Sequence, residues 1–540
     1  MTLARPLVLT AALAVAGCSA SAPMAPATDA PPADGPAPTD IVQDVPLMFE
    51  DEIVPADHLA TAREYAATIT PQELAGLLYT YSDDFLRGRD TGEPGQRFAA
   101  TFLAGQYAAM GVAPRGRGIA DTTYALEPYL QPFQLERRAT SGVRFSASVG
   151  GEQVLTVALP GDGVVPMVPV FGTVPDVEDA PVVFVGDGSA LDGVDLAGAF
   201  ALAVPATQGE VQSLAGTLLD AGAASVLMPL APTADPFQRF VGGATRERLG
   251  MMSDDDPRGA LILMGQDTAE ALLGGPLAEA TVGPTRATMS SSADATVDAV
   301  DTENVIAFVE GSDLADEVVV ISAHLDHVGD DGEGEDAIYN GADDDGSGTV
   351  AMLEIAEAFQ RAKDAGDGPR RSILFLHVTG EEKGLFGSAY YTDRDPVVPI
   401  ENTVANLNID MIGRYDPERG FETTDYVYII GGDLISQDLH DWNAAANTAM
   451  GTDLLLSDRF NSPDDPNQFF RRSDHWNFGK YDVPFIFYFT GTHEDYHGVG
   501  DEARKIDYDR LARISRLIFG TAWDLATRDE RPQVSGAGFN

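Results

Sequence analysis

The stretch SILFLHVTGEEKGLFGS (residues 372–388) joins an apolar run to two adjacent glutamates. Residues 372–380 are mostly apolar, which is typical of a buried strand in a parallel sheet. Glu381 and Glu382 follow at the end of this strand, where two neighbouring carboxylates repel each other. The stretch therefore predicts a strand of an α/β fold with two acidic residues at its carboxyl end. The placement of these two residues side by side requires an explanation.

Apolar runs of this kind recur through the C-terminal half of the chain. Apolar runs alternate with amphipathic helices, the pattern of an α/β sandwich with a mostly parallel, mixed sheet covered by helices. The further strand runs are NVIAFVEG (304–311), EVVVISAH (317–324), ANLNIDMIG (405–413) and PFIFYFTG (484–491). The expected helices are residues 348–362 and 509–526, and the second places Leu511, Ile514, Ile518 and Leu525 on one face.

Metal-binding side chains lie at or after the carboxyl ends of these runs. Open α/β sheets bind ligands at that edge, so we expect these groups to meet. His324 and Asp326 share a face of an extended strand, which fits a ligating imidazole and the acid that orients it. Each motif alone also fits a solvated strand end or an acidic loop before a helix. Five motifs in chain order favour a metal site: His324 with Asp326, Asp343–Asp345, Glu381 with Glu382, Asp410, and His493 with His497, with His327 and His377 close by.

The composition excludes several classes of protein. The chain has 540 residues, which indicates two or three domains. Its formal charge of −50 excludes the phosphate backbone of nucleic acid as a general partner, and fits either a solvated acidic surface or adaptation to salt. Cys18 is the only cysteine, so neither a cysteine nucleophile nor a cysteine-bound zinc is expected.

Residues 1–18 predict a lipoprotein signal peptide. Arg5 precedes the apolar run PLVLTAALAVAG (6–17), which is too short to span a membrane. The ending VAGC resembles the lipobox of bacterial lipoproteins, which makes Cys18 the lipidated residue. The expectation is an exported protein, lipid-anchored in the bacterial cell envelope on the periplasmic or outer-membrane face. The alternative is an ordinary signal peptide cut nearby and a secreted protein.

The rest of the chain predicts a tether and two folded parts. Residues 19–45 are a Pro/Ala-rich tether, and residues 46–140 form a helical N-terminal part of the catalytic domain. Thr70, Pro71 and Glu73 predict a capped helix start, and a second helix is expected to bury a stripe of Phe98, Phe102 and Ala109. Residues 141–290 contain short β-type runs (181–186, 199–205, 224–230, 260–265) and no histidine, which indicates a non-catalytic insert before the catalytic domain at 291–530.

Five segments together resemble the co-catalytic zinc exopeptidases of the aminopeptidase Y and bacterial leucyl-aminopeptidase type. The segments are AHLDH (323–327), NGADDDGSG (340–348), TGEEKGLFGS (379–388), NIDMIGR (408–414) and DYHGVGD (495–501), in the order of that family. The insert, with VVFVG, AFALAVP and AGAASVLM, resembles a protease-associated domain.

The resemblance implies a set of roles at the matching positions. His324 and Asp410 would hold one metal, Glu382 and His497 the other, and Asp344 would bridge them, with Asp343 as the alternative in the triple aspartate. Glu381 matches the general base, Asp326 the acid behind the ligand, and Tyr496 a hydroxyl that in some relatives donates to the developing oxyanion. The segment RRSDHWNF (471–478) resembles a substrate-side segment and offers Arg472, Asp474 and His475 as binding residues.

The chemistry implied is hydrolysis of peptide bonds. Two cations about 3.5–4 Å apart activate water and polarise the scissile carbonyl. Oxygen and imidazole ligands suit two Zn²⁺ ions, with Co²⁺ or Mn²⁺ as substitutes. An aminopeptidase is favoured because acids that could face a free amine are plentiful. A glutamate carboxypeptidase-like enzyme, with Arg471 and Arg472 facing a carboxylate, and a metal-free binding homologue remain the alternatives.

Overall fold

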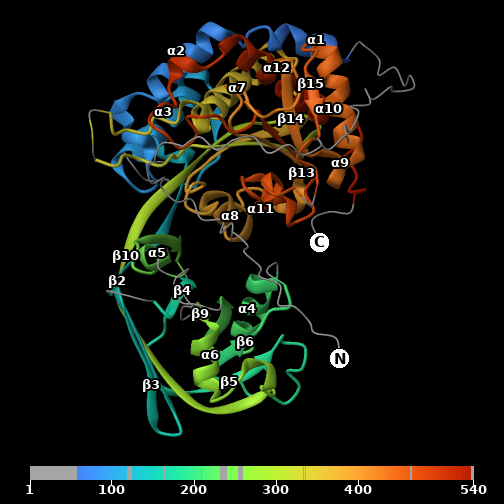
Figure 1. Ribbon diagram of the computed structural model, residues 1–540. Helices are drawn as coiled ribbons and strands as arrows, with labels where there is room; N and C mark the ends of the chain where they lie inside the picture. Colours follow the sequence, from blue (N-terminus) through green and yellow to red (C-terminus); the bar gives the residue numbers. More distant parts are fainter. Residues whose placement is uncertain are drawn as a thin grey trace, which may run out of the picture. The chain divides into compact units, whose positions relative to one another are not determined.

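The computed structural model describes residues 58–536, apart from 118–124, 162–164, 208–209, 232–236, 238–239, 253–258, 333, 335 and 463–464 (Figure 1). The signal peptide, Cys18 and the tether therefore lie outside the described residues. The chain divides into two compact units: Met1–Phe133 with Thr302–Asn540, and Gln134–Asp301. The insert predicted at 141–290 falls inside the second of these. Among the described residues, no helix has the length and apolar character needed to cross a membrane.

The sheet of the first unit is mixed and mostly parallel, which confirms the predicted fold class. Its strands run in the order β15-β14-β16-β13-β11-β12-β10. The neighbours β13, β11 and β12 are parallel, as are β13 and β16. β14 pairs antiparallel with β16, and β10 antiparallel with β12. The bounds are β10 Gly283–Val309, β11 Leu314–His324, β12 Arg371–Val378, β13 Thr403–Ile409, β14 Tyr426–Gly431, β15 Leu455–Ser457 and β16 Phe485–Phe489.

Helices cover both faces of this sheet (Figure 1). Alternate strand residues face opposite sides, so Val319 and Ile321 of β11 join one apolar core while Val318 and Val320 join another. The helix α12, Tyr508–Thr527, buries all four predicted apolar positions in the first core. The helices on that face are α1 His58–Ala66, α2 Pro71–Tyr81, α3 Pro94–Met110, α7 Gly348–Ala365, α10 Gln437–Met450 and α12, and those on the other are α8 Phe386–Asp393 and α11 His475–Gly479.

The N-terminal helices confirm one prediction and correct another. Thr70 caps α2 by accepting from the backbone N–H of Glu73, as the capping box predicts. In α3 the predicted stripe is wrong at two of its three positions: Phe98 is 49% exposed and Ala109 is exposed, whereas Phe102 is partly buried against the core. The helix instead packs through smaller residues that allow close approach, and Phe98 stacks on Phe85 at the surface. The buried residues of α3 are Gly95, Gln96, Ala99, Ala100, Leu103, Ala104 and Tyr107.

The second unit has a β-rich core of its own. The four predicted runs form β5 (Val177–Gly186), β6 (Phe200–Ala203), β7 (Ser225–Ala231) and β9 (Leu261–Gly265), which pair in parallel in that order. Their apolar side chains pack with the helices α4 (Val211–Asp220) and α6 (Gln266–Leu273). The unit also contains most of β10, which pairs with β5, and β2 Leu130–Val149, β3 Glu152–Leu159, β4 Met167–Phe171, β8 Arg248–Met251 and α5 Val241–Ala244.

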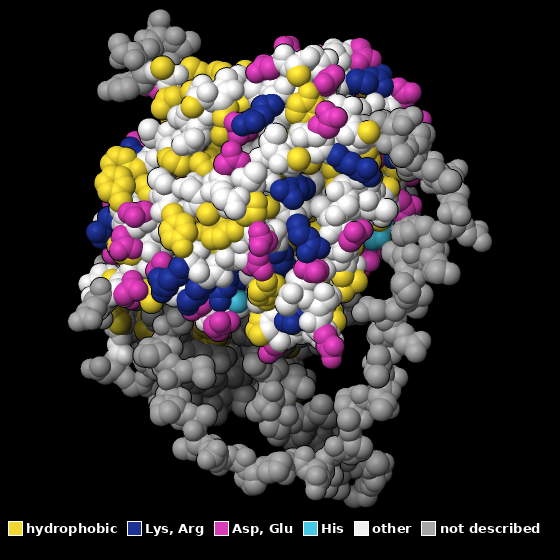
Figure 2. Space-filling model, turned by 90° about the horizontal axis from the view of Figure 1, so that it is seen from above, with side chains coloured by type: hydrophobic (Ala, Val, Ile, Leu, Met, Phe, Trp, Pro, Cys, Tyr) yellow, Lys and Arg dark blue, Asp and Glu magenta, His cyan; other side chains and the backbone are white. Residues whose placement is uncertain are grey.

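Acidic side chains are spread over the face seen in Figure 2, with Lys and Arg among them. Acidic side chains also form ion pairs at the surface: Arg361 lies 2.7 Å from Glu357, and Arg370 lies 2.8 Å from Asp313. Exposed pairs of this kind contribute little to stability. The large negative charge is therefore not concentrated in one patch on this face.

Glu354 is an acid on the buried face of α7. Burial, with smaller contributions from Glu73 and Glu357 and against the opposing effect of Arg361, raises its pKa to about 8. The native state therefore binds more protons than the unfolded chain between the ordinary pKa of 4.5 and a pKa of about 8. The contribution of Glu354 to the free energy of unfolding is fully present below this window and is lost as the pH rises through it.

We expect Glu354→Gln to raise the free energy of unfolding at pH 8 by about 1–3 kcal/mol and to leave it unchanged near pH 4. Thermal unfolding at the two pH values measures the difference. Asp364→Asn is the matched control, because it removes an exposed acid of the same helix, keeps an acceptor for Gln360, and lies outside the groups that shift the pKa of Glu354; it is expected to give no such gain. Equal unfolding temperatures for Glu354→Gln and the wild type at pH 8 would contradict the burial argument.

Candidate metal centre

Four parallel strands bring the predicted ligands to one edge of the sheet. His324 is the last residue of β11, Glu381 and Glu382 follow β12, Asp410 follows β13, and His497 lies in the loop after β16. Asp344 comes from the π-turn Ala342–Ser347 that leads into α7. The meeting of these side chains follows from the parallel pairing of the strands, whose carboxyl ends share an edge.

His324, Asp344 and Asp410 form the first group of ligand atoms. Nε2 of His324 lies 3.2 Å from Oδ1 of Asp344 and 3.7 Å from Oδ1 of Asp410. Its Nδ1 lies 3.1 Å from the backbone oxygen of Asp326, which directs Nε2 toward the acids. The other oxygen of Asp410 accepts from the hydroxyl of Ser473 at 2.8 Å.

Asp344, Glu382 and two histidines form the second group. Nε2 of His497 lies 3.1 Å from Oδ2 of Asp344 and 3.1 Å from Oε2 of Glu382. Nδ1 of His327 lies 2.7 Å from the other oxygen of Glu382 and 3.9 Å from Oδ2 of Asp344. The two oxygens of Asp344 thus face different groups, the arrangement that a bridging carboxylate requires.

Asp343, the alternative bridge, faces elsewhere. One of its oxygens accepts from the N–H of Gly413 at 2.6 Å, and the other lies 3.3 Å from Nε2 of His493. Asp501 holds the turn by accepting from the backbone N–H groups of Asp343 and Asp344. The geometry therefore supports Asp344 as the acid shared by both groups.

Asp326 and Glu381 lie behind and beside the ligands. The carboxylate of Asp326 accepts from the hydroxyl of Thr91 at 2.7 Å and from the backbone N–H of Glu381 at 3.2 Å. Partial burial raises the pKa of Glu381, and the carboxylates of Glu382, Asp410 and Asp474 raise it further against the opposing effect of His324. The raised pKa makes the Glu381 carboxylate more basic than an ordinary glutamate, and Asp326 holds the backbone of this residue.

The electrostatics of the site favour cations. Burial alone would lower the pKa of His497, but Glu382 and Asp344 outweigh it and raise the pKa to about 11. Burial would raise the pKa of Glu382, yet its histidine neighbours bring it down to about 2. These acids thus retain their negative charge and draw positive charge to the imidazoles. A divalent cation would take the place of those imidazole protons, because metal ligation requires neutral histidine.

The donor set fits zinc. Nε2 of His324 is buried without a hydrogen-bond partner, although it faces two acids. Its distances of 3.2 and 3.7 Å to those acids match the spacing of ligands around one shared ion, about 3.3–3.5 Å for tetrahedral zinc. Imidazole and carboxylate ligands in these proportions suit Zn²⁺ better than Ca²⁺ or Mg²⁺.

The predicted substrate-side residues divide into two kinds. The ring of Tyr496 stacks on His497 with centroids 4.0 Å apart, and Arg472 donates to its hydroxyl at 3.4 Å. Asp474 is buried and accepts from the hydroxyl of Ser388, and burial raises its pKa to about 7. Tyr496 and Arg472 thus lie beside the ligands, whereas Asp474 lies behind them.

The structure does not support His475 as a substrate contact. It is fully buried, stacks on Phe487, and its Nε2 lies 3.0 Å from the oxygen of Phe470. Burial lowers its pKa to about 3. His377 is likewise a core residue, with Nε2 2.8 Å from the hydroxyl of Tyr107, so its place near a motif had no bearing on the site.

Two residues at the site had no role in the sequence interpretation. His327 contacts Glu382, and its spacing of three from His324 in AHLDH was the available signal. Arg89 is 1% exposed and donates to the backbone oxygens of Leu325, Asn340 and Gly341. It holds together the two loops that carry His324 and Asp344, and no local pattern marks it.

We expect His327→Ala to weaken zinc binding by about 10–100-fold, because a residue that orients a ligand contributes about that much to metal affinity. Competition with a zinc chelator measures the change. His377→Gln, which also alters a buried histidine but one outside the site, is the matched control. Equal zinc affinity for His327→Ala and the wild type would show that the contact with Glu382 is incidental.

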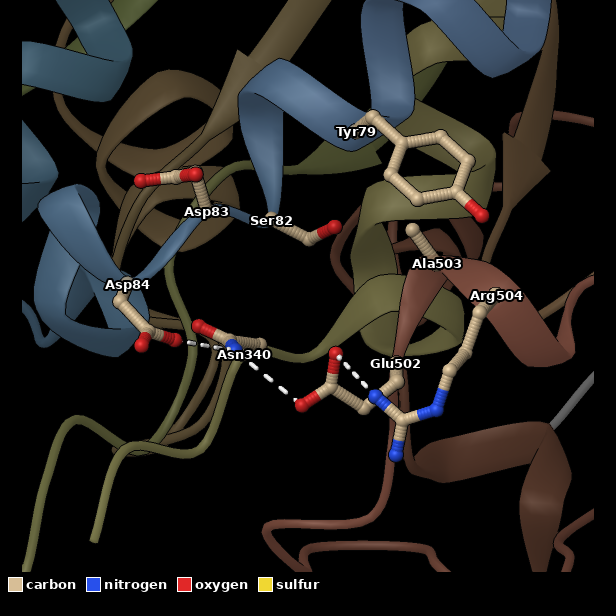
Figure 3. Close-up of a pocket in the computed structure, with 8 residues that line it drawn as sticks. All are labelled: Tyr79, Ser82, Asp83, Asp84, Asn340, Glu502, Ala503 and Arg504. Atoms are coloured by element: carbon tan, nitrogen blue, oxygen red, sulfur yellow. Dashed lines mark hydrogen bonds and ion pairs between the residues drawn. The ribbon is translucent and has the colours of Figure 1, made fainter. Parts of the chain in front are cut away.

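A pocket of about 230 Å³ lies beside the ligand loop but contains none of the predicted ligands (Figure 3). Asn340 donates across it to Asp84 at 2.8 Å and to Glu502 at 3.4 Å. The pocket adjoins the site along the chain, since Asn340 precedes Gly341 and Glu502 follows Asp501. It is lined by Tyr79, Ser82, Asp83, Asp84, Asn340, Glu502, Ala503 and Arg504.

Fold and site define an α/β protein with two groups of potential metal ligands at the carboxyl edge of its sheet. Residues 304–522 match the model of Peptidase family M28. All the ligands described above lie within these residues.

Known proteins with similar sequences include metallopeptidases. A probable zinc metalloprotease of Pyricularia oryzae is 28% identical over 268 residues, 43% of this chain and 51% of its own length. Aminopeptidase YwaD of Bacillus subtilis is 24% identical over 226 residues, 40% of this chain and 43% of its own. The chain thus aligns with only about half the length of these relatives.

Among solved structures, an aminopeptidase from Aneurinibacillus sp. strain AM-1 has a TM-score of 0.49 and 20% identity, covering 89% of this chain and 98% of that one.

Proposed function

We propose that the protein is a zinc-dependent aminopeptidase that removes N-terminal residues from peptides with two metal ions. The observation that carries this proposal is Asp344, whose two oxygens face two separate groups of ligand atoms. His324 and Asp410 would hold one ion, and Glu382 and His497 the other. The matched family and the names of the relatives support zinc and peptide substrates.

The chain's own residues supply the proton transfers. When bound, zinc supplies Lewis-acid polarisation of the scissile carbonyl and acidifies water. Glu381, with its raised pKa, accepts a proton from the attacking water and delivers it to the leaving amine. The Tyr496 hydroxyl, beside His497, is placed to donate a hydrogen bond to the carbonyl oxygen as charge develops there.

The proposal extends to location and to the insert. Residues 1–18 and Cys18 are proposed to export the protein and anchor it to a membrane of the cell envelope, on the strength of the VAGC ending alone. The second unit is proposed to be a protease-associated domain. Its support is the β-rich core and the resemblance of its runs to such domains.

A carboxypeptidase is the second candidate, and one observation favours it. Arg472 reaches the hydroxyl of Tyr496, so it offers a cation for a substrate carboxylate beside the ligands. A probable glutamate carboxypeptidase of Arabidopsis thaliana is 33% identical, although over only 108 residues.

A panel of aminoacyl reporters and N-blocked peptides separates the two candidates. We expect cleavage only of substrates with a free amine, and loss of that cleavage with a metal chelator. Arg472→Ala is expected to change the KM of these substrates less than threefold, because an aminopeptidase does not bind a terminal carboxylate there. Cleavage confined to N-blocked peptides, with a tenfold or greater rise in KM for Arg472→Ala, would favour the carboxypeptidase instead.

A further inference from the structure

Asp433, His440 and Asp458 form a cluster that the catalytic proposal does not use. Asp433 lies in the short helix α9 (Gly432–Ile435) after β14, His440 lies in α10, and Asp458 follows β15. Each offers one ligand atom, and these atoms lie within 4.8 Å of one another. Three segments that are separate in the chain thus direct an imidazole and two carboxylates to one point.

From this cluster we propose a further metal site, for a divalent first-row transition metal such as Zn²⁺. His440 carries the argument, because its side chain is only 6% exposed and its Nδ1 is buried without a hydrogen-bond partner. Nδ1 lies 3.9 Å from Oδ1 of Asp458, too far for a hydrogen bond. A buried nitrogen that faces an acid beyond hydrogen-bond distance has room for an ion between the two.

The predicted catalytic site has a similar arrangement of an imidazole and two carboxylates. There Nε2 of His324 is also buried, also lacks a hydrogen-bond partner, and lies 3.7 Å from an oxygen of Asp410. In both clusters a buried imidazole nitrogen without a hydrogen-bond partner lies near two carboxylates whose ligand atoms are within 4.8 Å of one another.

The surroundings hold the cluster in place. The Asn461 amide donates to Oδ1 of Asp433 at 3.1 Å, and its own oxygen accepts from the N–H of Gly431 at 3.0 Å. Carboxylates that bind metals are oriented by such hydrogen bonds. Gly432 has a φ of +28°, and a Cβ there would lie 3.0 Å from Nδ1 of His440. The absence of that Cβ keeps the space beside Nδ1 open.

The donor atoms select the cation. One imidazole and two carboxylates suit Zn²⁺, Co²⁺ or Mn²⁺, whereas Ca²⁺ and Mg²⁺ prefer oxygen ligands alone. Asp458 is 39% exposed, so the ion would exchange with solvent and complete its shell with water.

The bound ion would fasten the loop after β15 to α9 and α10. Arg459, the next residue, pairs with Asp416 at 3.0 Å, and Phe460 packs on Phe469. The chain then continues to Ser473, which donates to Asp410. The site is therefore expected to stabilise the segment that supports the catalytic ligands, without contributing a ligand to them.

Zinc content tests the proposal. The full chain, dialysed against Zn²⁺ and then against metal-free buffer, is analysed for bound zinc and for its unfolding temperature. We expect His440→Ala and Asp458→Asn each to bind one zinc ion per chain fewer than the wild type, and to lose several degrees of the rise in unfolding temperature that zinc produces. Asp458→Asn keeps nearly the same side-chain shape and an acceptor for Asn461. It therefore separates the loss of a ligand from a folding defect, which His440→Ala alone could not do.

Asp441→Asn is the matched control, because it removes one charge next to His440 and keeps an acceptor for Gln437. It is expected to bind as much zinc as the wild type. Equal zinc content and an equal temperature rise in Asp458→Asn and the wild type would overturn the proposal and leave only a contact between His440 and Asp458. If Asp441→Asn also lost zinc, the proposal would be overturned, because zinc binding would then depend on the negative charge of the region and not on Asp458 as a ligand.

Discussion

Replacing Glu381 with glutamine is expected to lower kcat by roughly 10²–10⁴-fold while the bound zinc stays unchanged. Glutamine has nearly the same shape but cannot accept the proton of the attacking water. The backbone N–H of residue 381 would still donate to Asp326, so the local fold is retained. Steady-state kinetics and zinc analysis on the same preparation measure both effects.

Glu382→Gln is the matched control for this prediction. It makes the same chemical change one residue away, but on a carboxylate that contacts His327 and His497. This variant is expected to lose zinc together with activity. If Glu381→Gln kept the kcat of the wild type, or if it lost zinc as Glu382→Gln does, the division of the pair into one base and one ligand would be wrong.

Asp344→Ala is expected to abolish measurable hydrolysis and to remove both catalytic zinc ions. The single carboxylate faces His324 on one side and His497 on the other, so its loss leaves each ion one ligand short. Zinc content after dialysis is expected to fall by two ions per chain relative to the wild type.

Asp343→Asn tests whether the neighbouring aspartate could be the bridge instead. Its carboxylate contacts Gly413 and His493, so the variant is expected to keep both zinc ions and to change stability more than chemistry. Loss of zinc in Asp343→Asn with retention in Asp344→Ala would reverse the assignment.

Much of the fold could be predicted from the sequence because buried parallel strands are apolar on both faces. The runs at 317–324, 405–413 and 484–491 all contain strands of the sheet, and their order explains why their polar ends meet. The buried face of α12 followed from its helical spacing. The antiparallel strand β14 was not predicted, although Tyr426, Tyr428 and Ile430 pack in a core of their own.

The features that could not be predicted from the sequence depend on contacts between segments that are distant in the chain. In α3 the size of a side chain did not decide its burial, because close packing favoured Ala99 and Ala104 over Phe98. Arg89 is about 250 residues from the loop oxygens that it binds, and nothing around it in the sequence marks that role. The role of His327 likewise depends on a carboxylate from another strand end.

Zinc reconstitution of the full chain tests the central claim most directly. The protein is treated with a chelator, freed of it, and assayed on a reporter with a free amine before and after Zn²⁺ is added. The dinuclear site predicts no hydrolysis in the metal-free protein and recovery of the original rate with zinc. Hydrolysis that persists at the original rate in protein shown to hold no metal would contradict the account.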